Sequence, residues 1–247
     1  VVQDAFTTYF ETQLVLDALT LLQALGFTPL LAPYQANGKP LHVHGFLKAF
    51  ARTAERNSAM LTTLAKTGLP LVGLEPSMTL AYRDEYKKIL GAQAPQVLLV
   101  QEWLATQVDH LHAQASRFAP GHFSLLAHCT EKTNAAGSIR DWQTVFSELQ
   151  QSLDVIATGC CGMAGTYGHE TANLESSRHI YSQSWAKVVN DPKLQGRLTA
   201  SGYSCRSQAQ RIDQVQLPHP LQILLGQLSE PSSDSQSHGK RTANELK

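Results

Sequence analysis

The residues best suited to chemistry in this sequence are its cysteines, two of which are neighbours. The cysteines are Cys129, Cys160, Cys161 and Cys205. Cys160 and Cys161 lie in the glycine-rich stretch ATGCCGMAGTYGHE, residues 157–170. Adjacent cysteines make a poor core and an awkward disulfide, but on a loop without bulky neighbours both sulfurs can reach one polynuclear metal centre. Gly159 and Gly162 let the backbone approach closely and donate hydrogen bonds to sulfur.

Other interpretations of the thiols stay open at this point. Free cysteines are often simply small buried residues. A structural zinc site usually shows short Cys-x-x-Cys pairs, and this sequence has none. Cys160 and Cys161 are also compatible with a vicinal disulfide or a dithiol redox pair without metal.

Apolar runs that resemble strands alternate with helical patterns along the chain, which predicts an α/β fold with mostly parallel sheets. We expect strands at 28–33, 70–74, 96–100, 123–129 and 154–159. We expect helices at 10–26, 45–68, 102–115, 141–153, 170–189, 204–212 and 219–228. The carboxyl ends of parallel strands meet at one edge of a sheet, where ligands bind. Cys129, Cys160 and Cys161 follow two of these strands, and a further short strand is expected before Cys205. We therefore expect the cysteines to converge there, near helix N-termini that favour thiolates.

The order of elements indicates two homologous halves. We expect a cysteine-free half at 1–100 and a thiol-bearing half at 101–228, each with a small, mostly parallel sheet flanked by helices. In this alignment a strand ends near Ala5 in the first half and at Cys129 in the second. The segment 42–45 matches 159–162, and Ser77 and Met78 match Ser204 and Cys205. The tail at 229–247 is polar and rich in serine, so we predict disorder there.

The composition of the chain limits the classes of function that are possible. The chain has 247 residues, with twenty basic and twenty acidic side chains. This balance gives no electrostatic case for nucleic acid or an anionic membrane as a partner. We see no apolar run long enough for a membrane span and no signal peptide, and we expect a cytoplasmic fragment of a larger protein. Cysteines in such a protein favour metal or redox chemistry over disulfides.

The cysteine pattern resembles a known family. Cys129, then GCCG at 159–162, then Cys205 is similar to the cysteine-rich CCG domain, which occurs in a subunit of heterodisulfide reductase, in the iron–sulfur subunit of anaerobic glycerol-3-phosphate dehydrogenase and in lactate-oxidation proteins. The longer strings HCTEKT, GCCGMAGTYGHE, GYSCRSQ and GLEPSMTLAYRDEY resemble the C-terminal part of large bacterial FAD-linked oxidases with iron–sulfur domains, the D-2-hydroxyglutarate dehydrogenase type. The resemblance extends from Val2 to about Leu228.

The resemblance implies an iron–sulfur electron-transfer domain of a flavin-linked 2-hydroxy-acid dehydrogenase, not catalytically complete alone. Its implied partners are flavin and ferredoxin-like modules of the same polypeptide or complex and a downstream electron acceptor. FAD would bind only in the absent module, since this chain has no G-x-G-x-x-G loop. The parent enzyme would place the domain in the cytoplasm, or peripherally at the inner membrane.

Two departures from the family pattern limit the number of thiolates available to bind a cluster. The final Cys-x-x-Cys reads Cys205 to Gln208, and the first half has VHG at Val43–Gly45 and Met78 in place of thiols. Four thiolates remain, which is the number that one [4Fe–4S] cluster needs. The alternatives are a metal-free dithiol redox module, as in heterodisulfide reductase, and a non-catalytic domain that docks subunits.

Several residues near the motifs are candidates for supporting roles. Those around the thiols are His128, Gly159, Gly162, His169, Ser204 and Arg206; those between the halves are His44, Met78 and Arg83. Either histidine beside the thiols could donate to a cluster sulfur, replace a ligand or simply be a polar loop residue. Arg206 could offset cluster charge or lie exposed at a helix start. We expect Arg83 to form an inter-half salt bridge with Asp84 or Glu85, and a strand to carry His44.

Overall fold

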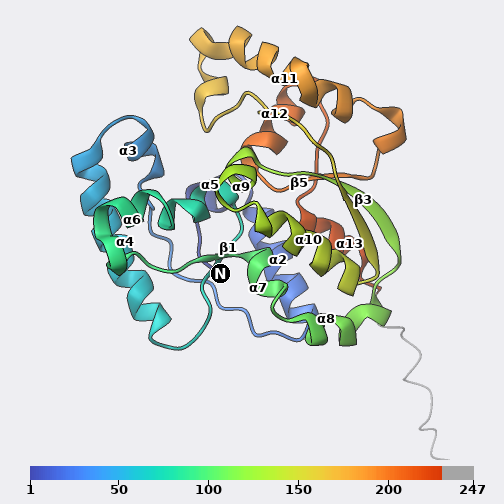
Figure 1. Cartoon of the computed structure of the whole chain (residues 1–247), viewed down its shortest axis with the longest axis horizontal. Coiled ribbons are helices and arrows are strands. Elements are labelled where there is room, and N and C mark those ends of the chain that lie inside the picture. The colour runs from blue at the N-terminus through green and yellow to red at the C-terminus, as the bar shows by residue number, and fades with distance from the viewer. Residues whose placement is uncertain (230–247) are drawn as a thin grey trace, which may run out of the picture.

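The computed structural model describes residues 1–229 as a mostly helical α/β protein with two small parallel sheets (Figure 1). The predicted α/β class is therefore confirmed at this level. The tail expected at 229–247 lies outside the described residues, apart from Ser229.

The larger sheet has three parallel strands with β3 in the centre. These strands are β3 (Gly121–Leu126), β4 (Gln151–Val155) and β5 (Leu198–Ala200), in the order β4–β3–β5. In the register, Phe123 pairs with Leu153 and Leu125 pairs with Thr199. The last four residues of β3 are all buried, as expected for a central parallel strand with both faces covered.

The smaller sheet pairs β1 (Val72–Gly73) with β2 (Leu98–Leu99) in parallel. Val2 forms a parallel bridge with Gly73 and extends this sheet on the other side. The Ala32 amide donates to the carbonyl of Val1 at 2.9 Å, so the segment around Ala32 lies beside the N-terminal residues. The strand predicted at 28–33 is otherwise wrong, because Pro29 and Pro33 remove two backbone donors that a ladder would need.

The helices lie around and between the two sheets. In the first part of the chain they are α1 (Ala5–Tyr9), α2 (Thr12–Ala24), α3 (Lys39–Val43), α4 (Leu47–Ala65), α5 (Pro76–Thr79) and α6 (Glu85–Leu90). In the second part they are α7 (Val100–Leu104), α8 (Val108–Gln114), α9 (Cys129–Asn134), α10 (Gly137–Glu148), α11 (Leu174–Val189), α12 (Tyr203–Asp213) and α13 (Pro220–Gln227).

Three sequence predictions of elements are corrected here. Ala5 begins a helix and does not end a strand, because Asp4 caps α1 through bonds from the amides of Phe6 and Thr7. His44 follows α3 and does not lie on a strand. The single helix expected at 102–115 is two, α7 and α8.

The main core joins helices that are far apart in sequence. α2 packs against α13, and α10 packs against α7. Leu21 and Leu221 are fully buried in this core, as are Leu104 and Phe146. A hydrogen bond of 2.7 Å from Gln222 Nε2 to Asp17 Oδ2 also joins α13 to α2. The contact between α2 and α13 therefore joins the two predicted halves, whereas α7 and α10 both lie in the second half.

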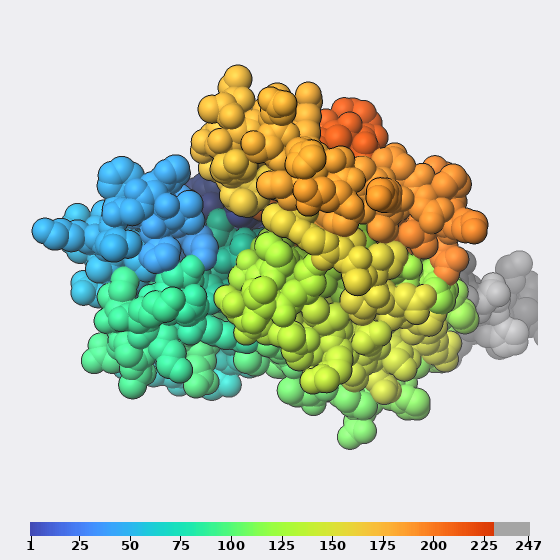
Figure 2. All heavy atoms as spheres, turned by 45° about the horizontal axis from the view of Figure 1, so that its top comes forward, coloured from blue at the N-terminus to red at the C-terminus, as the bar shows by residue number. Residues whose placement is uncertain are grey.

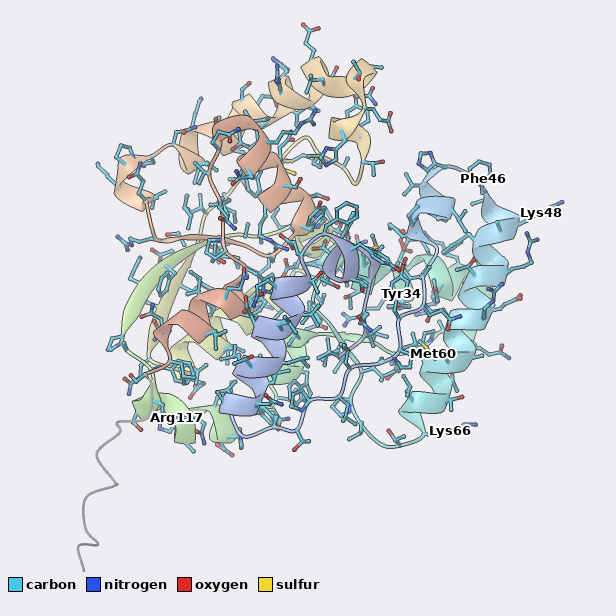
Figure 3. The ribbon with its side chains drawn as sticks, turned by 180° about the vertical axis from the view of Figure 1, so that it is seen from behind. Tyr34, Phe46, Lys48, Met60, Lys66 and Arg117 are labelled. Carbon is cyan, nitrogen blue, oxygen red and sulfur yellow. The ribbon has the colours of Figure 1, made fainter. Side chains whose placement is uncertain are left out.

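Two helical lobes stand apart above this core. Figure 2 shows a hollow between the α3–α4 lobe, in blue, and the α11 lobe, in orange, with N-terminal residues at its floor. Seen from behind, α4 runs along one flank from Phe46 and Lys48 past Met60 to Lys66 (Figure 3). Among residues 1–229, the structure has no helix long and apolar enough to cross a bilayer.

Candidate thiol site

Three segments place the cysteines beyond the carboxyl ends of the three strands of the larger sheet. Cys129 is the first residue of α9, after β3. Cys160 and Cys161 lie on the loop after β4, and Cys205 lies in the first turn of α12, after β5. Because the strands are parallel, these ends share one edge of the sheet.

The four sulfurs form a continuous row. Cys129 and Cys160, Cys160 and Cys161, and Cys161 and Cys205 lie close enough for each thiol to shift the pKa of a neighbour. All four thiols are free. Cys161 and Cys205 are buried, Cys129 is half-buried and Cys160 is exposed, so the row reaches the surface at Cys160.

The neighbours of Cys160 favour its thiolate form. Hydrogen bonds from the thiols of Cys129 and Cys161 and from the Gly162 amide lower the pKa of Cys160 to about 2. The same hydrogen bonds, together with burial, raise the pKa of Cys129 and of Cys161. The amide of Gly162 lies 3.3 Å from the Cys160 sulfur. One negative sulfur is thus stabilised by three neighbours.

Helix α11 holds the glycines of the thiol loop. The Gly159 amide donates to Ser184 Oγ, and the Gly159 carbonyl accepts from Trp185 Nε1, each at 3.0 Å. Gly162 has φ +83°, and a Cβ there would lie 2.3 Å from the carbonyl oxygen of Ser177. Gly162 is therefore required by the loop, whereas a Cβ at Gly159 would lie 3.3 Å from Ser184 Oγ and need only a small shift.

His128 is used as a helix cap next to the thiols. Its Nδ1 accepts from the Thr130 amide at 3.2 Å, and burial lowers the pKa of the ring. The ring also packs so tightly on Gly202 that a Cβ there would lie 2.2 Å from His128 Cδ2. Within the described residues, His128 thus sits at the site as a neutral ring whose Nδ1 is already engaged.

His169 lies away from this arrangement. It ends the 3-10 helix Tyr167–His169 and is exposed. Burial and the nearby Arg211 lower the pKa of its ring. Within the described residues, no hydrogen bond joins its side chain to a thiol.

Arg206 is buried, so the alternative that it lies exposed at a helix start is wrong. Its Nε donates to Glu11 Oε1 at 3.0 Å, its Nη2 pairs with Glu11 Oε2, and its Nη1 donates to the Ala200 carbonyl at 2.8 Å. Glu11 therefore offsets the charge of Arg206. Ser204, the other candidate in this turn, is buried directly before Cys205.

The inter-half candidates have different partners from those expected. Arg83 pairs with Glu102, because Asp84 is engaged with Lys88 and Glu85 with Lys39. Arg83 therefore forms a salt bridge, but its partner is Glu102 and not Asp84 or Glu85 as predicted.

The other two inter-half candidates differ in burial. Met78 is buried, and Asn37 Nδ2 donates to its carbonyl at 3.2 Å. His44 is exposed. Met78 and Arg83 thus each bond a residue distant in sequence, whereas His44 lies at the surface.

A buried polar network beside the thiols was not predicted from the sequence. Glu131 accepts from Ser201 Oγ at 2.5 Å, from Gln101 Nε2 at 2.8 Å and from Ser138 Oγ at 3.2 Å. Burial raises the pKa of Glu131. Lys132 Nζ donates to the carbonyl of Thr158, at 2.7 Å, just before the thiol loop.

Glu75 is a second functional candidate that the sequence reasoning missed. It is fully buried and contacts the amide of Tyr203, at the start of the helix that carries Cys205. A carboxylate directly before Pro76 was the available signal, since this pattern marks a helix start.

The donor set fits an iron–sulfur cluster in number and kind. Four free sulfurs lie in one row, and an amide donates to one of them. Among the described residues, no three His, Cys, Asp or Glu side chains are grouped as ligands of a single metal ion.

The fold and the site define a class: an α/β unit with a thiol row at the carboxyl edge of a parallel sheet. No family model matches the chain. It is 54% identical over 225 residues to D-2-hydroxyglutarate dehydrogenase of Pseudomonas putida and 42% identical over 228 residues to that of Escherichia coli. Each alignment covers 91% of this chain and 22% of the relative.

A more distant relative is one of the subunits of the anaerobic glycerol-3-phosphate dehydrogenase of Escherichia coli. It is 24% identical over 230 residues, which cover 89% of this chain and 56% of the relative. The chain is thus similar to a segment of bacterial D-2-hydroxyglutarate dehydrogenases, as the sequence motifs predicted. It spans about a fifth of the length of these relatives.

Proposed function

We propose that this chain is an iron–sulfur electron-transfer domain of a flavin-linked dehydrogenase that acts on a 2-hydroxy acid of the D-2-hydroxyglutarate type. The observation that carries the proposal is the row of four free thiols from three strand ends. The similarity to D-2-hydroxyglutarate dehydrogenases supports the class of parent enzyme.

Cys129, Cys160, Cys161 and Cys205 would hold one [4Fe–4S] cluster, which supplies a one-electron carrier when bound. The residues of the chain prepare the place for it. The Gly162 amide donates to sulfur, α11 fixes the loop, and the Lys132 ammonium lies beside the loop through its bond to Thr158. The exposed Cys160 gives this site an edge at the surface, where an electron donor can approach.

The chain depends on other modules for catalysis. A flavin module would oxidise the substrate, a ferredoxin-like module would relay electrons, and both would belong to the four fifths of the relatives that this chain does not match. The substrate and FAD would therefore bind outside this chain, and a separate acceptor would receive the electrons.

We further propose that 1–100 and 101–228 are homologous halves. Their sheets support this, since the segment at Ala32, then Val2, then β1 repeats the order β4, β3, β5. In this alignment of the halves, Ala5 is equivalent to Cys129 and Met78 is equivalent to Cys205. The first half thus keeps the architecture without the thiols.

The test is to purify this chain anaerobically and count iron and acid-labile sulfide, with an EPR spectrum after dithionite reduction. We expect about four irons and four sulfides per chain, as for one [4Fe–4S] cluster. Cys160→Ser should lose the iron and the spectrum, whereas Thr166→Ser, on the same loop, should keep both. A chain that stays free of iron after reconstitution would overturn the proposal.

One observation favours a second candidate, a metal-free dithiol module. Cys160 is an exposed free thiol next to Cys161, its neighbours lower its pKa, and a thiolate is the form that attacks a disulfide. Iron-free protein whose thiols close to a disulfide on oxidation would support this candidate. Iron-free protein without a disulfide would instead support a docking domain.

A further inference from the structure

The helix that carries Cys205 begins without a cap of its own. The cap position of α12 is Gly202, which has no side chain to bond the free amides of the first turn. No other residue fits there, since any Cβ would overlap the ring of His128. Close packing beside the thiols therefore removes the usual capping group from this helix.

Glu75, from the cysteine-free half, supplies the missing acceptor. Its Oε2 accepts from the Tyr203 amide at 2.6 Å, and its Oε1 accepts from the amide and hydroxyl of Ser77 at 3.2 and 2.8 Å. One carboxylate thus caps α5 in its own half and α12 in the other. Both oxygens accept and neither donates, which is the pattern of an ionised carboxylate.

The carboxylate of Glu75 lies close to the thiol row. The Tyr203 amide, which it accepts from at 2.6 Å, is only two residues before Cys205 in the first turn of α12. Glu75 is completely buried, so water does not screen this charge.

We propose that Glu75 is a positioning residue of the thiol site, which fixes the start of α12 and whose negative charge lowers the reduction potential of the centre held there. The second part rests on the proposed function. The reduced form of a cluster carries one more negative charge than the oxidised form, so a fixed carboxylate nearby opposes reduction.

Two substitutions in the whole chain separate the cap from the charge. Glu75→Ala removes the acceptor, and the Tyr203 amide should then exchange hydrogen at least about tenfold faster, because its bond is lost. Glu75→Gln keeps the size and removes the charge, so iron content should stay and the midpoint potential should move to more positive values. Asp84→Asn, which neutralises an exposed carboxylate of the same half, should change neither quantity.

Unchanged exchange at Tyr203 in Glu75→Ala would overturn the capping role. A midpoint potential of Glu75→Gln equal to that of Asp84→Asn would overturn the electrostatic role. If the unsubstituted chain binds no iron, the proposed function fails, yet the exchange measurement still decides the capping role because it needs no cluster.

Discussion

At the scale of single residues, close backbone approaches decide which side chains the thiol site accepts. Gly162 combines a positive φ with a neighbouring carbonyl oxygen that leaves no room for a Cβ. Gly165 has a similar φ of +69°, but a Cβ there would meet nothing within 4 Å. Substitutions at these two glycines therefore distinguish the cost of backbone strain, which both share, from the cost of the clash, which only Gly162 has.

Gly162→Ala should lower the free energy of unfolding by about 3 kcal/mol or more, because strain and a clash with backbone add. Gly165→Ala should lower it by only about 1 kcal/mol, the strain of a positive φ. Urea denaturation of both variants measures the difference. Equal losses would show that the Ser177 carbonyl moves aside freely.

Asp4 is a buried acid whose titration affects stability. Burial and then the charge of Glu75 raise the pKa of Asp4 from 3.8 to about 7. The folded protein therefore holds this proton between pH 4 and 7, whereas the unfolded chain releases it. The unfolded state binds fewer protons in that window, so stability falls as the pH rises through it.

The contribution of Asp4 should amount to about 4 kcal/mol between pH 4 and 7 at most. Asp4→Asn keeps an oxygen for the Phe6 and Thr7 amides and cannot ionise. Its free energy of unfolding should decline less steeply over this range, as measured by denaturation at several pH values. Parallel curves for the two proteins would mean that Asp4 is ionised throughout.

At the scale of elements, α11 works as the support of the thiol loop. Ser184 and Trp185 hold both backbone groups of Gly159, and Trp185 is almost completely buried. The same helix bonds α12's end through Tyr181, whose hydroxyl donates to Asp213 at 2.8 Å. One helix thus fixes the loop and the helix that carry three of the four thiols.

Trp185→Phe should make the backbone of 157–163 exchange hydrogen faster and cost about 1–2 kcal/mol, because the Gly159 carbonyl loses its donor. Tyr181→Phe removes a hydrogen bond of the same helix that does not reach the loop. It should cost a similar amount and leave loop exchange unchanged. Mass spectrometry of exchanged peptides distinguishes the two, and faster loop exchange in both variants would contradict a specific role for Trp185.

The elements that the sequence predicted well are those with a strong local pattern. The helices α4 and α11 lie within their predicted ranges, and the thiols do follow strand ends. The strand predicted at 123–129 is found as β3 at Gly121–Leu126, so that Cys129 begins a helix and does not end the strand. The strand at 28–33 failed because its apolar residues were counted without the two prolines. The break between α7 and α8, at Ala105–Gln107, carries no glycine or proline to announce it.

At the scale of the whole molecule, long-range pairs were beyond sequence reasoning. Arg206 finds Glu11 at a separation of 195 residues, and Tyr203 finds Glu75 at a separation of 128. Local patterns cannot select one acid among twenty. Each pair joins a carboxylate of the first half to α12 of the second half, next to Cys205. The first half thus supports the thiol site without contributing a thiol to it.

These contacts between the halves predict that the thiol-bearing half cannot fold alone. A fragment of 101–228 would expose the face of α13 that packs on α2, with Leu221 and Leu224 fully buried in the whole chain. Exposing two leucines costs about 3–6 kcal/mol, and an unpaired Arg206 without Glu11 costs about 3–5 kcal/mol. Domain stabilities are about 5–15 kcal/mol in total, so the fragment would have little or none left.

The fragment 101–228 should therefore give a poorly dispersed amide NMR spectrum and no cooperative unfolding transition. Adding the fragment 1–100 should restore both, since it returns α2 and Glu11, although the cut falls within the start of α7 and so weakens the complex. The uncut chain is the reference for chemical shifts. A dispersed spectrum and a cooperative transition from 101–228 alone would show that the two halves are independent domains, and that the contacts between α2 and α13 add stability without determining the fold.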